Sequence, residues 1–320
     1  MRPYLYGALL LAGGLSAGPA AALDCEDGMR AFEHHAGTTC IPVDPQRIVT
    51  LQDQNAMLPL LELGVTPVGS VGWVNPEGEQ VFRRIQGYDA SDVTFVGSYR
   101  GADKEAVAAV QPDLILATPW PPNAVEEFSA IAPVVVIDMF DQPMEDALMQ
   151  FADAVNQTRR AEELRAEWEA HLVAAKEELG DKLQTTTVSV VTYDGEVFRG
   201  QNPIQAAGMV FRGLELRRPA YEMTLGSTRE ERSWEAIQDH EADVMILFVS
   251  DQTGDVVHEF MEHPAVKATG VGQAGQVFHV NSSEVFGVAW GKGKAGVDAF
   301  VEVIGRADLD RDLIQEPGHN

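Results

Sequence analysis

One stretch without glycine or proline decides the fold: MEDALMQFADAVNQTRRAEELRAEWEAHLVAAKEE, residues 144–178. Apolar side chains recur at helical spacing through its second half and just beyond, at Leu164, Trp168, Leu172, Ala175 and Leu179. That half, about twenty residues, would be roughly 30 Å long as one helix, which is enough to cross a small domain. We therefore expect a long helix here that joins two lobes, and we place Trp168 in the core.

Short runs on both sides of this stretch predict strands, and those at residues 113–117 and 134–137 are almost fully apolar, which is typical of strands covered on both faces. The runs lie at residues 47–51, 65–71, 93–96, 113–117, 134–137, 187–192, 244–249 and 276–280. Helix-like segments, such as residues 55–63, alternate with them. The predicted fold class is therefore α/β, with two Rossmann-like lobes that have mainly parallel sheets and are joined by one long rigid helix.

The two halves of the chain share a short module. EAVAAVQPDLIL at residues 105–116 aligns without gaps with EAIQDHEADVMI at residues 235–246. Each copy predicts a short helix that runs into a buried strand, with one acid opening the helix and another before the strand. An acid in a first helical turn is favoured by the helix dipole, so capping alone could account for Glu105 and Glu235.

The chain of 320 residues is strongly acidic, with 23 Lys and Arg against 49 Asp and Glu and a net charge of −26. A composition of 45% hydrophobic and 22% charged residues indicates a folded protein. Its charge argues against a nucleic-acid partner, which needs a basic face, and against adhesion to an anionic bilayer.

Residues 1–22 have the pattern of a signal peptide. Arg2 precedes an apolar run at residues 5–15 that is too short to span a bilayer. The small residues 20–22, all alanine, occupy the expected cleavage positions. We expect cleavage after Ala22 and export of a soluble chain.

The two cysteines, Cys25 and Cys40, follow directly. In an exported chain we expect them to form a disulfide that staples an N-terminal arm, worth about 3 kcal/mol. A lipid anchor on Cys25 is the alternative, although Asp24 fits that processing poorly.

Three motifs that would suggest an enzyme fail on their context. GVGQAG at residues 270–275 has dinucleotide-binding spacing, but it precedes a strand instead of following one. His258 and His263 are five residues apart, so one helical face cannot present both to zinc. GKGKAG at residues 291–296 lacks the spacing and hydroxyl of a phosphate loop.

Several segments, in the same order, resemble the periplasmic binding proteins for iron-siderophore, haem and vitamin B12 uptake. They are PQRIVTL (45–51), LELGVTPVG (61–69), EAVAAVQPDLI (105–115), WEAI (234–237), ADVMI (242–246), PAVK (264–267) and GQVFHV (275–280). The arm CEDGMRAFEH (25–34) with CIP (40–42) resembles the start of ferric-siderophore members. The resemblance covers roughly residues 25–305.

This resemblance implies a ligand cleft between the lobes, small closure motions about a stiff connector, and delivery to an ABC transporter permease. It also implies that one glutamate on each lobe docks on the permease, and Glu105 and Glu235 occupy the matching positions. It further implies a periplasmic protein with no catalysis and no permanently bound cofactor or metal. We expect a monomer.

Candidate ligand-binding residues follow strands, because open α/β sheets bind ligands at their carboxyl ends. Arg100 follows residues 93–96, and Arg199 follows the first strand of the second lobe; both could hold an anionic ferric complex or instead pair with carboxylates. The aromatic candidates are Trp73, Tyr99, Trp120 and Trp290, for which core packing is the alternative. Arg83 and Arg84 could reach the rim, but a solvated helix face is the preferred interpretation.

The expected division is a signal peptide at 1–22, a stapled arm at 23–44, a lobe at 45–143, a helical segment at 144–182 and a lobe at 183–320. The expected function is capture of a ferric siderophore for an ABC importer. The alternatives are a haem-binding member, with Tyr99 as an axial iron ligand and Arg100 on a propionate, and an exported metal-dependent enzyme.

Overall fold

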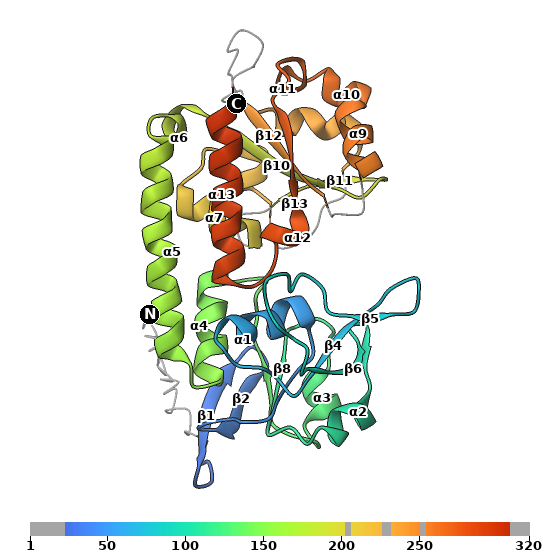
Figure 1. Ribbon diagram of the computed structural model, residues 1–320, viewed down its shortest axis with the longest axis vertical. Coiled ribbons are helices and arrows are strands. Elements are labelled where there is room, and N and C mark those ends of the chain that lie inside the picture. The colour runs from blue at the N-terminus through green and yellow to red at the C-terminus, as the bar shows by residue number, and fades with distance from the viewer. Residues whose placement is uncertain (1–22, 202–205, 226–231, 250–253, 308–320) are drawn as a thin grey trace, which may run out of the picture.

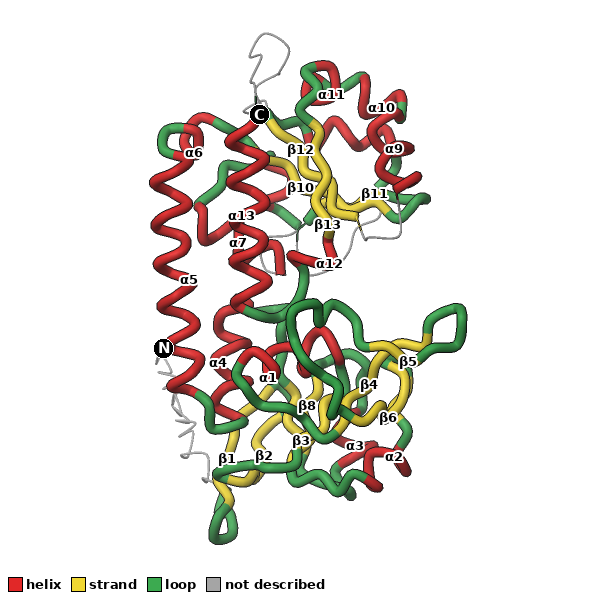
Figure 2. The backbone as a smooth tube through the Cα atoms, viewed as in Figure 1, coloured by secondary structure: helices red, strands yellow, loops and turns green. Residues whose placement is uncertain are grey.

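Two α/β lobes are joined by a long helix, α5 (Thr158–Leu179), in the computed structural model of the chain (Figure 1). The structure describes residues 23–201, 206–225, 232–249 and 254–307. The expected signal peptide at residues 1–22 lies outside the described residues. The expected fold class is confirmed: two lobes with mainly parallel sheets are joined by a long helical connector that runs along one side of both (Figure 2).

The first lobe is built on a sheet with the strand order β7-β6-β4-β3-β8-β9, and β5 pairs with β4. The central pairs β3–β4, β4–β6, β3–β8 and β8–β9 are parallel. The strands are β3 (Ile48–Thr50), β4 (Gly69–Val74), β5 (Gln80–Val81), β6 (Thr94–Ser98), β7 (Gly101–Ala102), β8 (Leu114–Ala117) and β9 (Val134–Val136). Its short helices are the π-helix η1 (Asp53–Met57), α1 (Leu58–Glu62), α2 (Lys104–Ala109) and α3 (Ala124–Phe128).

A strand was expected from residue 65, but β4 begins four residues later, at Gly69. Pro67 lacks an N–H group, so it cannot donate a hydrogen bond that would extend β4 toward the N-terminus of the strand.

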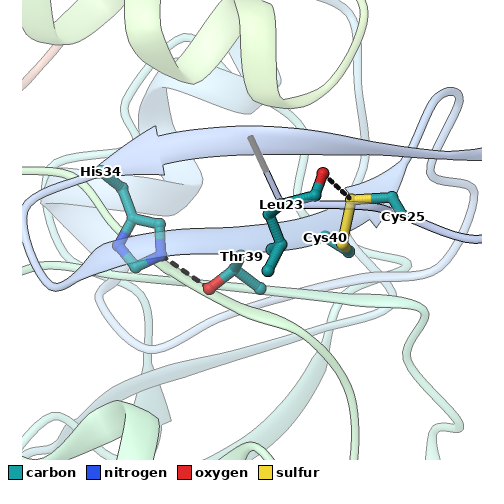
Figure 3. Close-up of a disulfide and its surroundings, with 5 residues drawn as sticks. All are labelled: Leu23, Cys25, His34, Thr39 and Cys40. Atoms are coloured by element: carbon teal, nitrogen blue, oxygen red, sulfur yellow. Dashed lines mark hydrogen bonds between the residues drawn. A yellow bond between two sulfur atoms is a disulfide. The ribbon is translucent and has the colours of Figure 1, made fainter. Parts of the chain in front are cut away.

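An antiparallel hairpin, β1 (Met29–His34) with β2 (Gly37–Pro42), precedes the first sheet. The disulfide between Cys25 and Cys40 ties the chain before β1 to β2, as Figure 3 shows. The predicted pairing is confirmed, so the arm is fixed covalently at its start.

Helices form a continuous layer along one side of both lobes (Figure 2). The glycine-free stretch divides into α4 (Met144–Ala154) and α5, because Asn156 adopts a left-handed φ of 56° between them. At 22 residues, α5 is about 33 Å long. The layer is completed by α6 (Lys182–Thr185), α7 (Ala206–Leu214) and α13 (Trp290–Arg306).

A second helix braces the connector, because α13 runs beside α5 (Figure 1). Trp168 of α5 is 3% exposed, and its ring is tilted against that of Trp290 of α13, with 6.4 Å between ring centroids. Its predicted core position is therefore confirmed. Lys294 Nζ lies 3.0 Å from a Glu167 carboxylate oxygen and links the two helices at the surface.

The second lobe has a sheet with the order β11-β10-β12-β13, in which only β10–β11 is antiparallel. The strands are β10 (Val188–Tyr193), β11 (Phe198–Gly200), β12 (Val244–Val249) and β13 (Val277–Asn281). Its helices are α8 (Ala220–Met223), the 3-10 helix η2 (Trp234–His240), α9 (Gly254–Glu262), α10 (Pro264–Lys267), α11 (Gly270–Gln273) and α12 (Ser282–Val285).

The repeated sequence module has the same structural role in both lobes. In the first copy α2 leads into β8, and in the second η2 leads into β12. The acids before the two strands also bond alike, since Asp113 accepts the backbone N–H of Arg47 at 2.9 Å and Asp243 accepts that of Thr187 at 2.6 Å. Each carboxylate therefore anchors the start of the neighbouring strand.

Within the part of the chain that the structure describes, no helix is both long and apolar enough to cross a bilayer.

Candidate ligand-binding site

A cavity of about 320 Å³ lies between the two lobes and is lined by both. The first lobe lines it from the ends of β3 and β9 and from the segment after β5, through Gln54, Asn55, Arg84, Met139 and Phe140. The second lobe lines it through Thr192, Tyr193, Asp194, Arg199, Gly200, Gln201, Leu225, Ser282, Phe286, Gly287 and Val288. Many of these residues lie at or just beyond the ends of strands, which is where open α/β sheets bind ligands.

One arginine from each lobe lines this cavity. Arg84 belongs to the first lobe, and its guanidinium carbon lies 5.4 Å from the ring centroid of Phe286, which belongs to the second. Arg199 stands on β11, and its Nη1 lies 2.6 Å from Oδ2 of Asp194. A ligand between the lobes therefore meets a cation on each side.

Asp194 stays ionised over most of the pH range. Partial burial alone would raise its pKa, but the hydrogen bond from Arg199 and the backbone N–H groups of Val197 and Glu196 lower the pKa to about 2. The carboxylate consequently offsets part of the charge of Arg199.

Tyr193 contributes an aromatic wall. Burial, together with its hydrogen bond to Glu259, raises the pKa of its hydroxyl to about 12. The hydroxyl donates to Glu259 Oε1 at 3.0 Å and stays protonated at neutral pH. Because the hydroxyl is engaged by Glu259, Tyr193 contributes its ring to the wall of the cavity.

A carboxylate of the first lobe holds the cavity segment of the second. Glu62 accepts the backbone N–H of Trp290 at 2.7 Å and that of Gly291 at 2.5 Å, both at the N-terminus of α13. The negative charge suits the positive end of the helix. Phe286, Gly287 and Val288 directly precede this helix, and the Val288 N–H also bonds the carbonyl of Gln54 across the lobes at 3.3 Å.

Of the six predicted ligand-binding residues, the structure brings only Arg199 into the cavity lining. Arg199 was expected in a loop but lies in β11, which pairs with β10. Trp73 is half-buried in β4, opposite Val81 of β5, and Trp120 is 58% exposed in the loop after β8. Both stand at the carboxyl edge of the first sheet, outside the cavity lining.

The expectation that Trp290 lines the cleft is wrong. The residue is 1% exposed and packs against Trp168 in the helical layer. It is the first residue of α13, so its ring turns into the core with the rest of that helix. The apolar spacing from Trp290 to Val297 and Phe300 was the available signal.

Tyr99 and Arg100 form the turn between β6 and β7 and do not line the cavity. Nε of Arg100 donates to the Tyr99 hydroxyl at 3.0 Å, and the guanidinium of Arg83 covers the ring of Tyr99.

The preferred interpretation of Arg83 and Arg84 as a solvated helix face is wrong as well. They lie in a bend between β5 and β6, and Arg84 has a φ of 60°. Phe286 was also missed, although a search of the residues just beyond the last predicted strand would have found it.

Glu105 and Glu235 are both exposed, in the first turns of α2 and η2. The N–H of Glu235 itself and the hydroxyl of Ser233 lower the pKa of Glu235, so its carboxylate stays charged. In Figure 1, α2 and α10, which packs against η2, lie at the outer ends of the two lobes. One of the two glutamates thus stands on each lobe.

Two α/β lobes, a stiff helical connector and a cavity between the lobes define a two-lobed ligand-binding protein. Residues 48–284 match the family described as periplasmic binding protein. The chain belongs to the periplasmic binding protein family.

Individual relatives agree with this assignment. The chain is 30% identical over 228 residues to the probable siderophore-binding lipoprotein YfiY of Bacillus subtilis, which is 68% of either chain. It is also 30% identical over 223 residues to the ferric enterobactin-binding periplasmic protein FepB of Escherichia coli, which is 67% of this chain and 69% of FepB. The structure of Staphylococcus aureus SirA complexed with staphyloferrin B superposes with a TM-score of 0.73 at 22% identity, over 86% of this chain and 98% of SirA.

Proposed function

We propose that this protein captures a ferric siderophore complex in the cavity between its lobes and delivers it to the permease of an ABC importer. The observation that carries the proposal is the pair of arginines, Arg84 and Arg199, which line one cavity from opposite lobes. Ferric complexes of many siderophores are anions with several oxygen atoms, and arginine holds such oxygens with charge-assisted hydrogen bonds. The names of YfiY and FepB support the same ligand class.

The arginines have to supply local attraction that the whole protein cannot. A net charge of −26 repels an anion at long range. Within the cavity, the low-dielectric walls of Phe140, Tyr193 and Phe286 strengthen the field of nearby charges. We propose that Trp73 and Trp120, at the carboxyl edge of the first sheet, contact the outer part of the ligand.

Haem binding through Tyr99 receives no support from this geometry. The Tyr99 hydroxyl is bonded to Arg100 and its ring lies under Arg83, so neither residue has the role that an axial ligand and its propionate partner need. Among the residues that the structure describes, no group of three or more His, Cys, Asp and Glu could hold a metal ion. We assign no catalytic step to this protein.

Titration of the exported protein with ferric siderophores and with haemin tests the ligand class. We expect quenching of tryptophan fluorescence by at least one ferric siderophore and no Soret-type band with haemin. A strong Soret-type band together with no response to any ferric siderophore would contradict the proposal.

We further propose that residues 1–22 direct export to the periplasm, and that Glu105 and Glu235 dock on basic residues of the permease. Exposed charges contribute little energy each, but two that are far apart fix the orientation of a partner. Glu105→Ala with Glu235→Ala should abolish uptake and leave ligand affinity unchanged. The control pair Glu77→Ala with Glu302→Ala removes the same charge elsewhere on the surface, and equal uptake by both pairs would refute the docking assignment.

A further inference from the structure

A buried carboxylate holds the segment that brings Arg84 to the cavity. The side chain of Asp53 is 0% exposed, and both of its oxygens bond to one residue, Arg83. Oδ2 accepts the backbone N–H of Arg83 and its Nε–H, both at 2.9 Å, and Oδ1 accepts from Nη2 at 2.6 Å. Asp53 therefore fixes the backbone and the side chain of Arg83 together.

The guanidinium of Arg83 is also held by an aromatic ring. Its central carbon lies 4.1 Å from the ring centroid of Tyr99, which is a favourable distance for a cation on the face of an aromatic ring. A buried carboxylate, a bidentate guanidinium and an aromatic ring leave Arg83 little freedom to move. Its role is to anchor the chain.

The next residue needs such an anchor. Arg84 has a φ of 60°, in the left-handed region that is unfavourable for a residue with a side chain. Residues 82–93, between β5 and β6, contain no helix or strand that would impose this conformation. Strained conformations of this kind persist only where the surroundings determine them.

Asp53 itself stands at the start of the π-helix η1, and Gln54 and Asn55 of the same helix line the cavity. Asp53 is not among the residues that line it. One carboxylate thus joins two cavity segments of the first lobe that are about thirty residues apart in the chain, and it does so from behind them.

We propose that Asp53 is a positioning residue for ligand recognition: it holds Arg84 in the cavity, opposite Arg199, through its three hydrogen bonds to Arg83. The inference rests on the proposed function, because it requires that Arg84 bind the ligand. Asp53 does not touch the ligand.

The direction in which Asp53→Asn changes the binding affinity distinguishes a positioning role from a purely electrostatic one. Asp53→Asn removes a negative charge near an anion site, so electrostatics alone predicts tighter binding of an anion. The amide cannot accept all three bonds from Arg83, so positioning predicts weaker binding. Asp194→Asn gives the comparison: it removes the same charge at the same cavity and weakens the pairing of Arg199, but it leaves Arg83 and Arg84 untouched, so it should tighten binding.

The experiment measures the dissociation constant of a ferric tris-catecholate complex, a trianion, for the wild type and for Asp53→Asn. The same substitution is then made in an Arg84→Ala background. We expect Asp53→Asn to weaken binding about tenfold in the wild type and less than twofold without the Arg84 side chain, because the two residues act as a unit. An equal loss in both backgrounds, or no loss in the wild type, would overturn the inference.

Two further measurements keep the test decisive. If Asp53→Asn fails to fold, Arg83→Lys replaces it in both backgrounds, since lysine keeps the charge but loses the bidentate geometry. If the wild type binds no ferric siderophore at all, it is the proposed function that fails; if it binds and the cycle shows no coupling, only the positioning role of Asp53 fails.

Discussion

Glu62→Gln should destabilise the protein by loosening the contact between the first lobe and α13. The carboxylate now accepts two backbone N–H groups, those of Trp290 and Gly291. An amide offers one oxygen, so one of these buried donors loses its partner, at a cost of about 1–3 kcal/mol. Loss of the negative charge at the helix N-terminus adds about 0.3–1 kcal/mol, and relief of the buried charge offsets part of both. We expect a net decrease of about 2 kcal/mol in the free energy of unfolding.

The stability difference between the wild type and Glu62→Gln should depend on pH in a definite direction. Burial raises the pKa of Glu62, against the lowering effects of the two N–H groups, Lys294 and Tyr88. The folded protein therefore holds this proton more tightly than the unfolded chain. Protonation of Glu62 therefore adds to the free energy of unfolding. This contribution is fully present below the ordinary pKa of a glutamate, and it is lost as the pH rises through the raised pKa of the folded protein. The difference between wild type and Glu62→Gln should widen as the pH is lowered from about 8 to about 5.

Urea unfolding followed by tryptophan fluorescence measures both effects, and Trp290 reports from the altered contact itself. Glu167→Gln is the control, because Glu167 is an exposed carboxylate of α5 that also interacts with Lys294. That change should leave the free energy of unfolding nearly unchanged, because an exposed ion pair contributes little. A Glu62→Gln protein that is as stable as the control, or a difference that shrinks toward low pH, would refute the reasoning.

Two further predictions concern stability. Replacing Cys25 and Cys40 by serine should lower the free energy of unfolding by about 3 kcal/mol, because the bridge closes a loop of 15 residues; calorimetry should show this, with ligand affinity unchanged. Gly200→Ala should destabilise the second lobe and weaken ligand binding, because the added Cβ would lie 2.6 Å from the ring of His240 and 2.8 Å from Leu225. A variant with wild-type melting temperature and affinity would show that His240 and Leu225 can move to make room.

The fold was predictable because its signals are local. The spacing of Leu164, Trp168 and Ala175 indicated the connector, and short apolar runs indicated the parallel strands. The break before α5 was missed, because it depends on the left-handed conformation of Asn156. The packing of α13 against α5 was missed too, since the contact that fixes the start of α13 joins Glu62 to residues more than two hundred positions later.

Residues of the site were predictable from the sequence only where they closely follow a predicted strand. Arg199 was found because it follows β10 closely, and the rule that ligands bind at strand ends applies to it directly. Arg84 follows no long strand; its place depends on Asp53, thirty residues earlier, and on Tyr99, sixteen residues later than Arg83. Trp290 shows the opposite failure, since a tryptophan beside a glycine suggests a loop and instead begins a buried helix.

The central claim is that one anionic ferric complex is held between Arg84 and Arg199, one from each lobe. The most direct measurement is the dissociation constant of a ferric tris-catecholate at several salt concentrations, for Arg84→Ala, Arg199→Ala and the double variant. We predict that each single change weakens binding about tenfold or more, and that each reduces the salt dependence. If either arginine can be removed with affinity and salt dependence unchanged, the ligand is not held between the two lobes as we describe.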